Sequence, residues 1–114
     1  MKPGQIIYIA HNGHRLYCEL IQVIEHKQSA WLRPLILSDQ RDRDEPPLFD
    51  VRNTSDLICQ LSWLELALDL DMLPLFSVLG KNLYPWEYDA IAKQELRTFI
   101  QSLFRHKSQD EVQP

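Results

Sequence analysis

The side chains whose types and spacing are compatible with chemistry are a pair of histidines and a pair of aspartates. His11 and His14 flank a tight turn, where two imidazoles could begin a metal site. No third ligand follows at a convincing spacing, so we interpret both histidines as part of a solvated turn. Asp69 and Asp71 have the types of an acid–base pair. An acid–base pair needs surroundings that push the two pKa values apart, and nothing in the sequence indicates such surroundings. We therefore interpret the two aspartates as part of a solvated acidic face.

Motifs that carry catalysis or hold a cofactor are missing from the sequence. It contains no glycine-rich phosphate loop, no serine-histidine-aspartate elbow motif and no paired-cysteine zinc motif. We therefore predict a protein that is not an enzyme and binds no cofactor and no metal. Cys18 and Cys59 could form a disulfide, but cysteines on predicted strands are more typical of buried free thiols in a reducing compartment.

Composition and charge indicate an ordinary globular protein. Of its 114 residues 45% are hydrophobic and 25% are charged, and the net charge of −4 argues against a dedicated nucleic-acid binder. The charge is uneven, because residues 38–80 carry three basic residues against nine acidic ones. No signal peptide is visible, and no apolar run approaches the roughly 20 residues that span a bilayer. We expect a cytoplasmic location.

Three consecutive strands are predicted at Gln5–Ala10, Leu16–Ile24 and Ala30–Leu37. Asn12-Gly13 between the first two is the strongest short hairpin signal. Both faces of the first strand are apolar. Either both faces of part of this strand are covered by other elements, or the sheet curls on itself. Pro34 cannot donate to a ladder, and it predicts an edge or a bulge in the third strand.

Two more strands, Leu48–Arg52 and Leu57–Gln60, follow a polar loop at Ser38–Pro47. Five short strands with a long loop after the third are typical of an SH3-like or related small barrel. The fold class that we predict is α+β, a small antiparallel SH3-like β-barrel over residues 1–60. Helical segments at 61–107 pack on it within one folding unit.

Helical segments are expected after the barrel, and residues 108–114 form a frayed tail. Ser62 and Glu65 match a capping box, so a short helix should open there, and Pro74 should interrupt the apolar stripe that follows. Leu73–Leu79 fits a helix or a strand equally well. From Trp86 to about His106 apolar residues recur at spacings of three and four, which predicts an amphipathic helix. Its stripe packs on the chain's own barrel or on a second copy, and the first is favoured.

Aromatic side chains surround the segment between the barrel and this long helix. They either pack the helix onto the barrel or stay exposed as anchors for a partner protein. These candidate partner-binding residues are Trp63, Tyr84, Trp86 and Tyr88. A basic and aromatic mixture on the first three strands is compatible with single-stranded nucleic acid, or with an aromatic core under scattered charges. Its candidate contacts are Arg15, Tyr17, Lys27 and Arg33.

The segments Leu16–Leu37 and Leu48–Arg52, the latter followed by Ser55-Asp56-Leu57, resemble a group of short cyanobacterial proteins with no assigned function. The resemblance implies a cytoplasmic protein of a photosynthetic bacterium and nothing about chemistry. We predict a non-catalytic protein-binding module, such as an assembly or regulatory factor, that is monomeric or dimerises through its C-terminal helix. The alternative is a small-barrel protein that binds single-stranded RNA or DNA, which a steep salt dependence of affinity would reveal.

Overall fold

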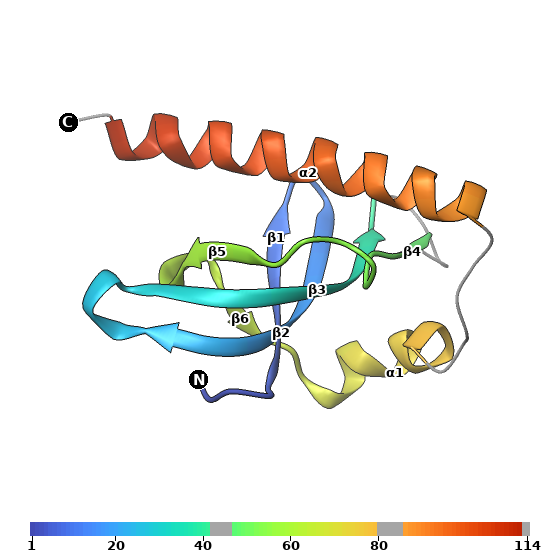
Figure 1. The fold of residues 1–114 in the computed structure, drawn as a ribbon, viewed down its shortest axis with the longest axis horizontal. Helices are drawn as coiled ribbons and strands as arrows, with labels where there is room; N and C mark the ends of the chain where they lie inside the picture. The colour runs from blue at the N-terminus through green and yellow to red at the C-terminus, as the bar shows by residue number, and fades with distance from the viewer. Residues whose placement is uncertain (42–46, 80–85, 113–114) are drawn as a thin grey trace.

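The computed structural model describes residues 1–41, 47–79 and 86–112, and within these ranges the side chains of all residues except 74, 77–79, 86–89 and 108–112. A six-stranded antiparallel sheet lies between two helices, α2 on one side and α1 on the other (Figure 1). The strands are β1 (Ile6–His11), β2 (His14–Ile24), β3 (Ser29–Asp39), β4 (Leu48–Asp50), β5 (Leu57–Gln60) and β6 (Glu65–Leu66). The predicted α+β class is confirmed.

The first three strands form the predicted meander. Asn12 and Gly13 both have positive φ, 50° and 76°, as a type I′ hairpin turn requires, and His11 and His14 face each other across it. The second connection is a short 3-10 turn, η1 (Glu25–Lys27), followed by Gln28 in the left-handed region. Local turn chemistry therefore determines the register of both hairpins.

The meander bends at two irregularities of its central ladder. Tyr17 pairs with Ile36 but Cys18 pairs with Pro34, so the predicted bulge at the proline is confirmed. A second register shift lies between Leu20 and Gln22. Bulges increase the local right-handed twist of a strand pair, and these two allow the long hairpin to curl around one apolar face.

The sheet does not close into the predicted barrel. Its strand order is β4-β3-β2-β1-β6, with β5 paired to the other half of β3. Across the described ranges, the end strands β4 and β6 are only three and two residues long, and they pair with β3 and β1 rather than with each other. Because these ladders are too short to wrap the sheet shut, the helix α2 (Trp86–Val112) covers its open side.

The main core lies between the curled sheet and α2. Ile7, Ile9, Leu16 and Leu20 from the sheet pack in one cluster with Ala92, Leu96, Phe99 and Leu103 from the helix. Most of the apolar stripe of α2 is therefore buried on the chain's own sheet, whereas Ile91 is 54% exposed. The helix continues to Val112, beyond the predicted end near His106, because no glycine or proline interrupts the sequence before Pro114.

A second, smaller cluster lies on the opposite face of the sheet, under α1 (Asp69–Leu79). Tyr17, Ile36 and Leu75 are its buried members, and Ile6 and Tyr8 pack against it. Successive residues of β1 thus pack on opposite faces of the sheet, because Ile7 and Ile9 belong to the main core. The expected double cover of the first strand is confirmed.

Two helix predictions between residues 61 and 79 are wrong. The segment from Ser62 to Glu65 forms no α-helix, because it enters the 3-10 turn η2 (Leu61–Trp63) and then β6, where pairing with β1 extends the backbone. Pro74 does not interrupt the helix that follows. Its missing N–H leaves the carbonyl of Leu70 without a helical donor, and residue 70 is exposed, so water can satisfy that carbonyl. Residues 73–79 are thereby assigned to a helix.

Both cysteines are buried free thiols, as favoured from the sequence. Cys18 and Cys59 belong to the main core, and burial raises the pKa of both thiols, that of Cys59 to about 11. A thiol with a raised pKa is a poor nucleophile at neutral pH, so these side chains act as small apolar packing groups. Neither helix, over the residues that the structure describes, has the length and apolar character needed to cross a membrane.

Candidate functional site

The predicted partner-binding aromatics are placed only in part. Trp63 is half-buried, and its ring packs edge-on against Phe104 of α2, with 5.1 Å between centroids and 78° between planes. Tyr84 lies outside the described residues, and so do the side chains of Trp86 and Tyr88. Trp63 therefore helps to hold α2 on the sheet, which was one of its two expected roles.

The four predicted nucleic-acid contacts do not form a free stacking surface. Tyr17 is 2% exposed, so a base cannot stack on its ring. The Arg15 guanidinium lies 4.4 Å above the Tyr8 ring and 3.3 Å from Asp71, and Arg33 lies 3.5 Å from Asp56. Lys27 is exposed in the η1 turn, at the far end of the β2–β3 hairpin.

Among the side chains that the structure describes, most of the exposed large apolar ones lie on α1 and the segment that enters it. Five large side chains there are 45–80% exposed, and together we call them the α1 surface: Leu66, Leu68, Leu70, Leu73 and Phe76. The last three recur every third residue, which places them along one face of the helix. The opposite face is anchored by Leu75, which is buried in the smaller cluster.

Polar contacts fix the start of α1. One carboxylate oxygen of Asp71 accepts a hydrogen bond from the backbone N–H of Leu68 (2.9 Å), and the other accepts one from Arg15 (3.3 Å). Asp71 thus caps the helix and ties it to β2. Asp69 and Asp71 were predicted to form a solvated acidic face. Asp71 is not free in solvent, because its carboxylate makes these structural contacts.

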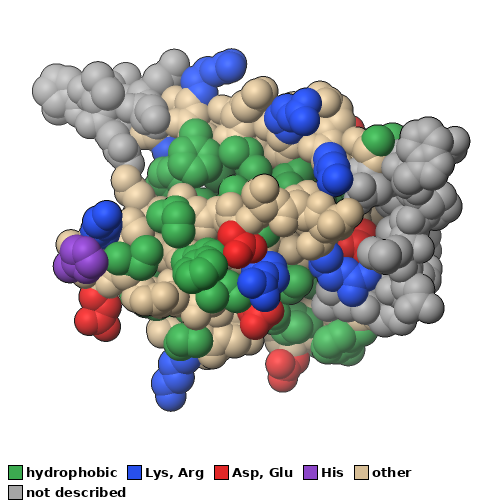
Figure 2. Space-filling model, viewed as in Figure 1, with side chains coloured by type: hydrophobic (Ala, Val, Ile, Leu, Met, Phe, Trp, Pro, Cys, Tyr) green, Lys and Arg blue, Asp and Glu red, His purple; other side chains and the backbone are tan. Residues whose placement is uncertain are grey.

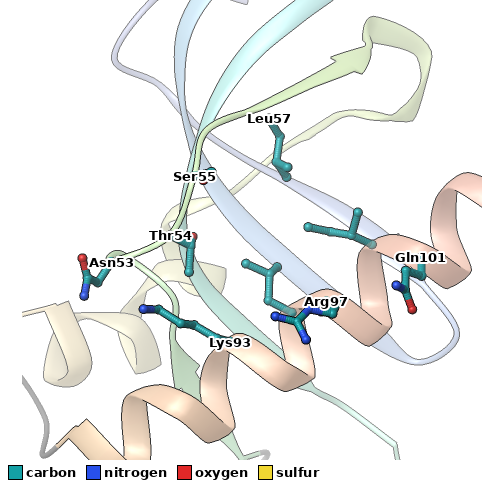
Figure 3. Close-up of a pocket in the computed structure, with 9 residues that line it drawn as sticks. Asn53, Thr54, Ser55, Leu57, Lys93, Arg97 and Gln101 are labelled. Atoms are coloured by element: carbon teal, nitrogen blue, oxygen red, sulfur yellow. The ribbon is translucent and has the colours of Figure 1, made fainter.

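A groove lies between α2 and the segment that enters β5 (Figure 3). Its volume is about 480 Å³, and its walls carry Asn53, Thr54 and Ser55 on one side and Lys93 and Arg97 on the other. Lys and Arg side chains stand along α2 on this face, above hydrophobic side chains that lie between the helix and the strands (Figure 2). Neither the composition nor the periodicity of the sequence indicated this groove.

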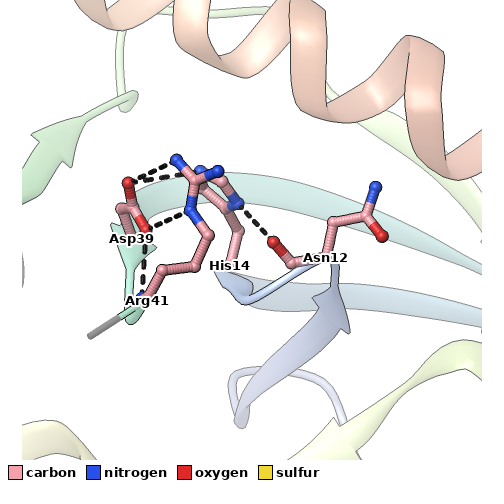
Figure 4. A network of polar contacts seen from close by, with 4 residues as sticks. All are labelled: Asn12, His14, Asp39 and Arg41. Atoms are coloured by element: carbon pink, nitrogen blue, oxygen red, sulfur yellow. Dashed lines mark hydrogen bonds and ion pairs between the residues drawn. The ribbon is translucent and has the colours of Figure 1, made fainter.

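The β1–β2 hairpin tip is not the predicted solvated turn, because it docks on α2. His11 Nε2 lies 2.9 Å from Ser102 Oγ, and the same hydroxyl oxygen accepts a hydrogen bond from the Asn12 amide (3.1 Å). Beside it, Asp39 accepts two hydrogen bonds from the Arg41 guanidinium and lies 3.8 Å from His14 (Figure 4). The Arg41 hydrogen bond holds the pKa of Asp39 well below its usual range.

The contact between Ser102 and His11 has the spacing of a nucleophile and its base. The hydroxyl oxygen accepts a hydrogen bond from Asn12, and the imidazole of His11 donates to it or accepts from it according to its tautomer. In the part of the chain that the structure describes, no carboxylate bonds to the other ring nitrogen of His11, and no cluster of three metal-ligating side chains is present. We therefore assign the pair to helix docking.

Acidification is expected to weaken this docking. Burial lowers the pKa of His11 below its ordinary 6.5, with help from His106, Lys107 and His14, whereas Ser102 opposes the shift. Between pH 6.5 and the lower folded pKa, the unfolded chain binds a proton that the folded chain does not. The contribution of His11 to stability is therefore complete above pH 6.5 and is lost as the pH falls to the folded pKa. Between pH 7 and 5 the melting temperature should fall more steeply for the wild type than for His11→Gln.

The matched control is His26→Gln, which removes an exposed histidine from the η1 turn. Its melting temperature should keep the wild-type pH dependence. Equal slopes for all three proteins in scanning calorimetry would show that His11 is not the group responsible.

Comparison of the chain with protein-family models, with curated proteins and with solved structures finds no match.

Proposed function

We propose that this protein is a non-catalytic protein-binding module and that the α1 surface is its contact site. The observation that carries the proposal is the exposure of five large apolar side chains on one short segment. Soluble proteins rarely leave such a group of side chains in water unless it binds something. Burying one leucine or phenylalanine contributes about 1.5–3 kcal/mol, so two or three of them can support a specific complex.

Charge selects the kind of partner. Residues 53–80 contain four acidic residues (Asp56, Glu65, Asp69 and Asp71) and no lysine, arginine or histidine. Asp71 pairs with Arg15 and Asp56 with Arg33, so the negative charge beside the α1 surface comes mainly from Glu65 and Asp69. A second copy placed face to face would bring those two carboxylates together, and an anionic membrane would repel them. The complementary occupant is an amphipathic helix of another protein, with an apolar stripe flanked by lysine or arginine.

The strand order supports a second proposal, that the open sheet follows the strand arrangement of SH3-like folds. β1 lies between β2 and β6, and the 3-10 turn η2 directly precedes β6, as in SH3-like folds. Folds of this plan serve many functions, so the plan alone does not decide among them. The α1 surface is what favours protein binding over nucleic-acid binding.

Two synthetic amphipathic peptides test the proposal. They share one leucine stripe and differ only in the flanking residues, lysine in one and glutamate in the other. The full chain should bind the lysine peptide and not the glutamate peptide in fluorescence anisotropy. Leu70→Asp or Phe76→Asp should weaken binding at least about tenfold, equivalent to about 1.4 kcal/mol. Both side chains are exposed, so neither substitution disturbs the core.

Ile58→Asp is the matched control, because Ile58 is as exposed as Phe76 but lies on β5. It should leave peptide affinity unchanged. Equal losses in all three variants, or equal binding of the two peptides, would contradict the proposal. Tight binding of an oligonucleotide that weakens steeply with salt would transfer the function to the nucleic-acid class.

A further inference from the structure

The groove between α2 and the β5 entry segment has the size and lining of a small-molecule site. Ligand sites of proteins occupy about 300–1,000 Å³, and this groove falls within that range. Its apolar floor is formed by Leu57, Leu96 and Ile100. In Figure 3 the side chain of Leu57 points toward α2, and Lys93 extends from the helix toward Asn53 and Thr54. Apolar and polar parts of a ligand would therefore meet different parts of the groove.

The polar lining of the groove includes two cationic side chains. Lys93 and Arg97 are one helical turn apart on α2, and none of the nine lining residues is an aspartate or glutamate. An anion bound between the two side chains would be attracted by both.

Neighbouring cations are already neutralised, unlike the arginine in the groove. Arg52 makes a close ion pair with Asp50 (2.7 Å), and Arg33 pairs with Asp56. Arg97, by contrast, forms neither an ion pair nor a hydrogen bond among residues 1–41, 47–79 and 86–112. Its guanidinium keeps its donors for a planar anionic group such as a phosphate or carboxylate.

The opposite wall adds neutral hydrogen-bonding groups. The Thr54 hydroxyl donates to the carbonyl oxygen of Val51 (2.6 Å), and this hydrogen bond fixes the turn. The lone pairs of the Thr54 hydroxyl oxygen remain as acceptors for a ligand. Asn53 and Ser55 add an amide and a second hydroxyl to the same wall. A ligand with its own hydroxyl or amino groups would be recognised there, next to its charged end.

We propose that this groove binds a small organic anion of mononucleotide size, with its phosphate or carboxylate at Lys93 and Arg97 and its apolar part on Leu57, Leu96 and Ile100. The site lies on a different element from the α1 surface, so it does not depend on the proposed function. A phosphate ester and a carboxylic acid share the required chemistry, and the experiment below distinguishes them.

Ligand-observed NMR with the full chain tests the site, using AMP, adenosine, octanoate and inorganic phosphate as probes. Either AMP or octanoate should bind, and the one that binds identifies the phosphate or the carboxylate class. If AMP binds, adenosine should bind at least tenfold more weakly, because it lacks the charge. Inorganic phosphate should also be weaker, because it lacks the part that lies on the apolar floor.

The test variant is Arg97→Gln, and its matched control is Arg105→Gln, an exposed cation on the same helix outside the groove. The first should weaken binding at least tenfold, and the second should not change it. Failure of both AMP and octanoate to bind would overturn the proposal. So would equal losses in the two variants, or inorganic phosphate binding as tightly as the best organic anion.

Discussion

Phe99→Ala is expected to lower the free energy of unfolding of the whole domain by about 3–5 kcal/mol. Phe99 is 5% exposed in the main core, and its ring lies edge-to-face with His11 and tilted against His14, at centroid distances of 6.0 and 6.2 Å. Its removal would open a cavity where α2, β1 and β2 meet. Small domains are stabilised by only about 5–15 kcal/mol in total, so this loss should shift the entire unfolding transition.

The matched control is Phe76→Ala, which removes the same atoms from a side chain that is 54% exposed on α1. Its effect should stay within about 0.5 kcal/mol. Urea titration followed by circular dichroism measures both variants. An unchanged midpoint for Phe99→Ala would mean that α2 does not belong to the core, and would make it an arm for a partner or a second copy.

Leu75→Ala is expected to release α1 from the sheet. Leu75 is the buried residue that α1 contributes to the smaller cluster, and truncating such a leucine costs about 2–5 kcal/mol. Of the other large apolar side chains that the structure describes on α1, Leu70, Leu73 and Phe76 belong to the exposed α1 surface and Met72 is half-buried. Amide hydrogen exchange should therefore speed up in α1 while β2 and β3 keep their protection.

Leu70→Ala makes the same chemical change at a position that is 80% exposed, and should leave exchange in α1 unchanged. These two variants also distinguish the docking of α1 on the sheet from the binding of a peptide to the α1 surface. Leu75→Ala should weaken peptide binding by misplacing the α1 surface, and Leu70→Ala by removing one contact. Faster exchange throughout the sheet in Leu75→Ala would show that the two clusters unfold as one unit.

Local signals in the sequence predict most of the sheet. Asn12-Gly13 sets a hairpin, Pro34 marks a bulge, and the apolar pattern of Leu57–Gln60 gives the bounds of β5. The segment around Glu65 is mispredicted because its partner, β1, lies about sixty residues earlier in the chain. A capping box is a local preference, and a distant ladder outweighs it.

The candidate sites are harder to predict, since each depends on distant residues. Ser102 meets the hairpin tip from 91 residues away, and Arg97 faces Thr54 across the groove. The α1 surface did leave a signal. Leu66–Leu79 contains more apolar residues than the smaller cluster can bury, so some of them had to be exposed. The prediction of a partner site instead used the aromatic residues around Trp63.

The order of layers along the chain also affects biosynthesis. The sheet is complete by residue 66, but the cover of its main apolar face is α2, which begins at residue 86. At about 5–20 residues per second, synthesis of residues 67–112 takes about two to nine seconds. Throughout that interval the nascent sheet exposes Ile7, Ile9 and Leu16 to other chains, and such surfaces are what chaperones bind during translation.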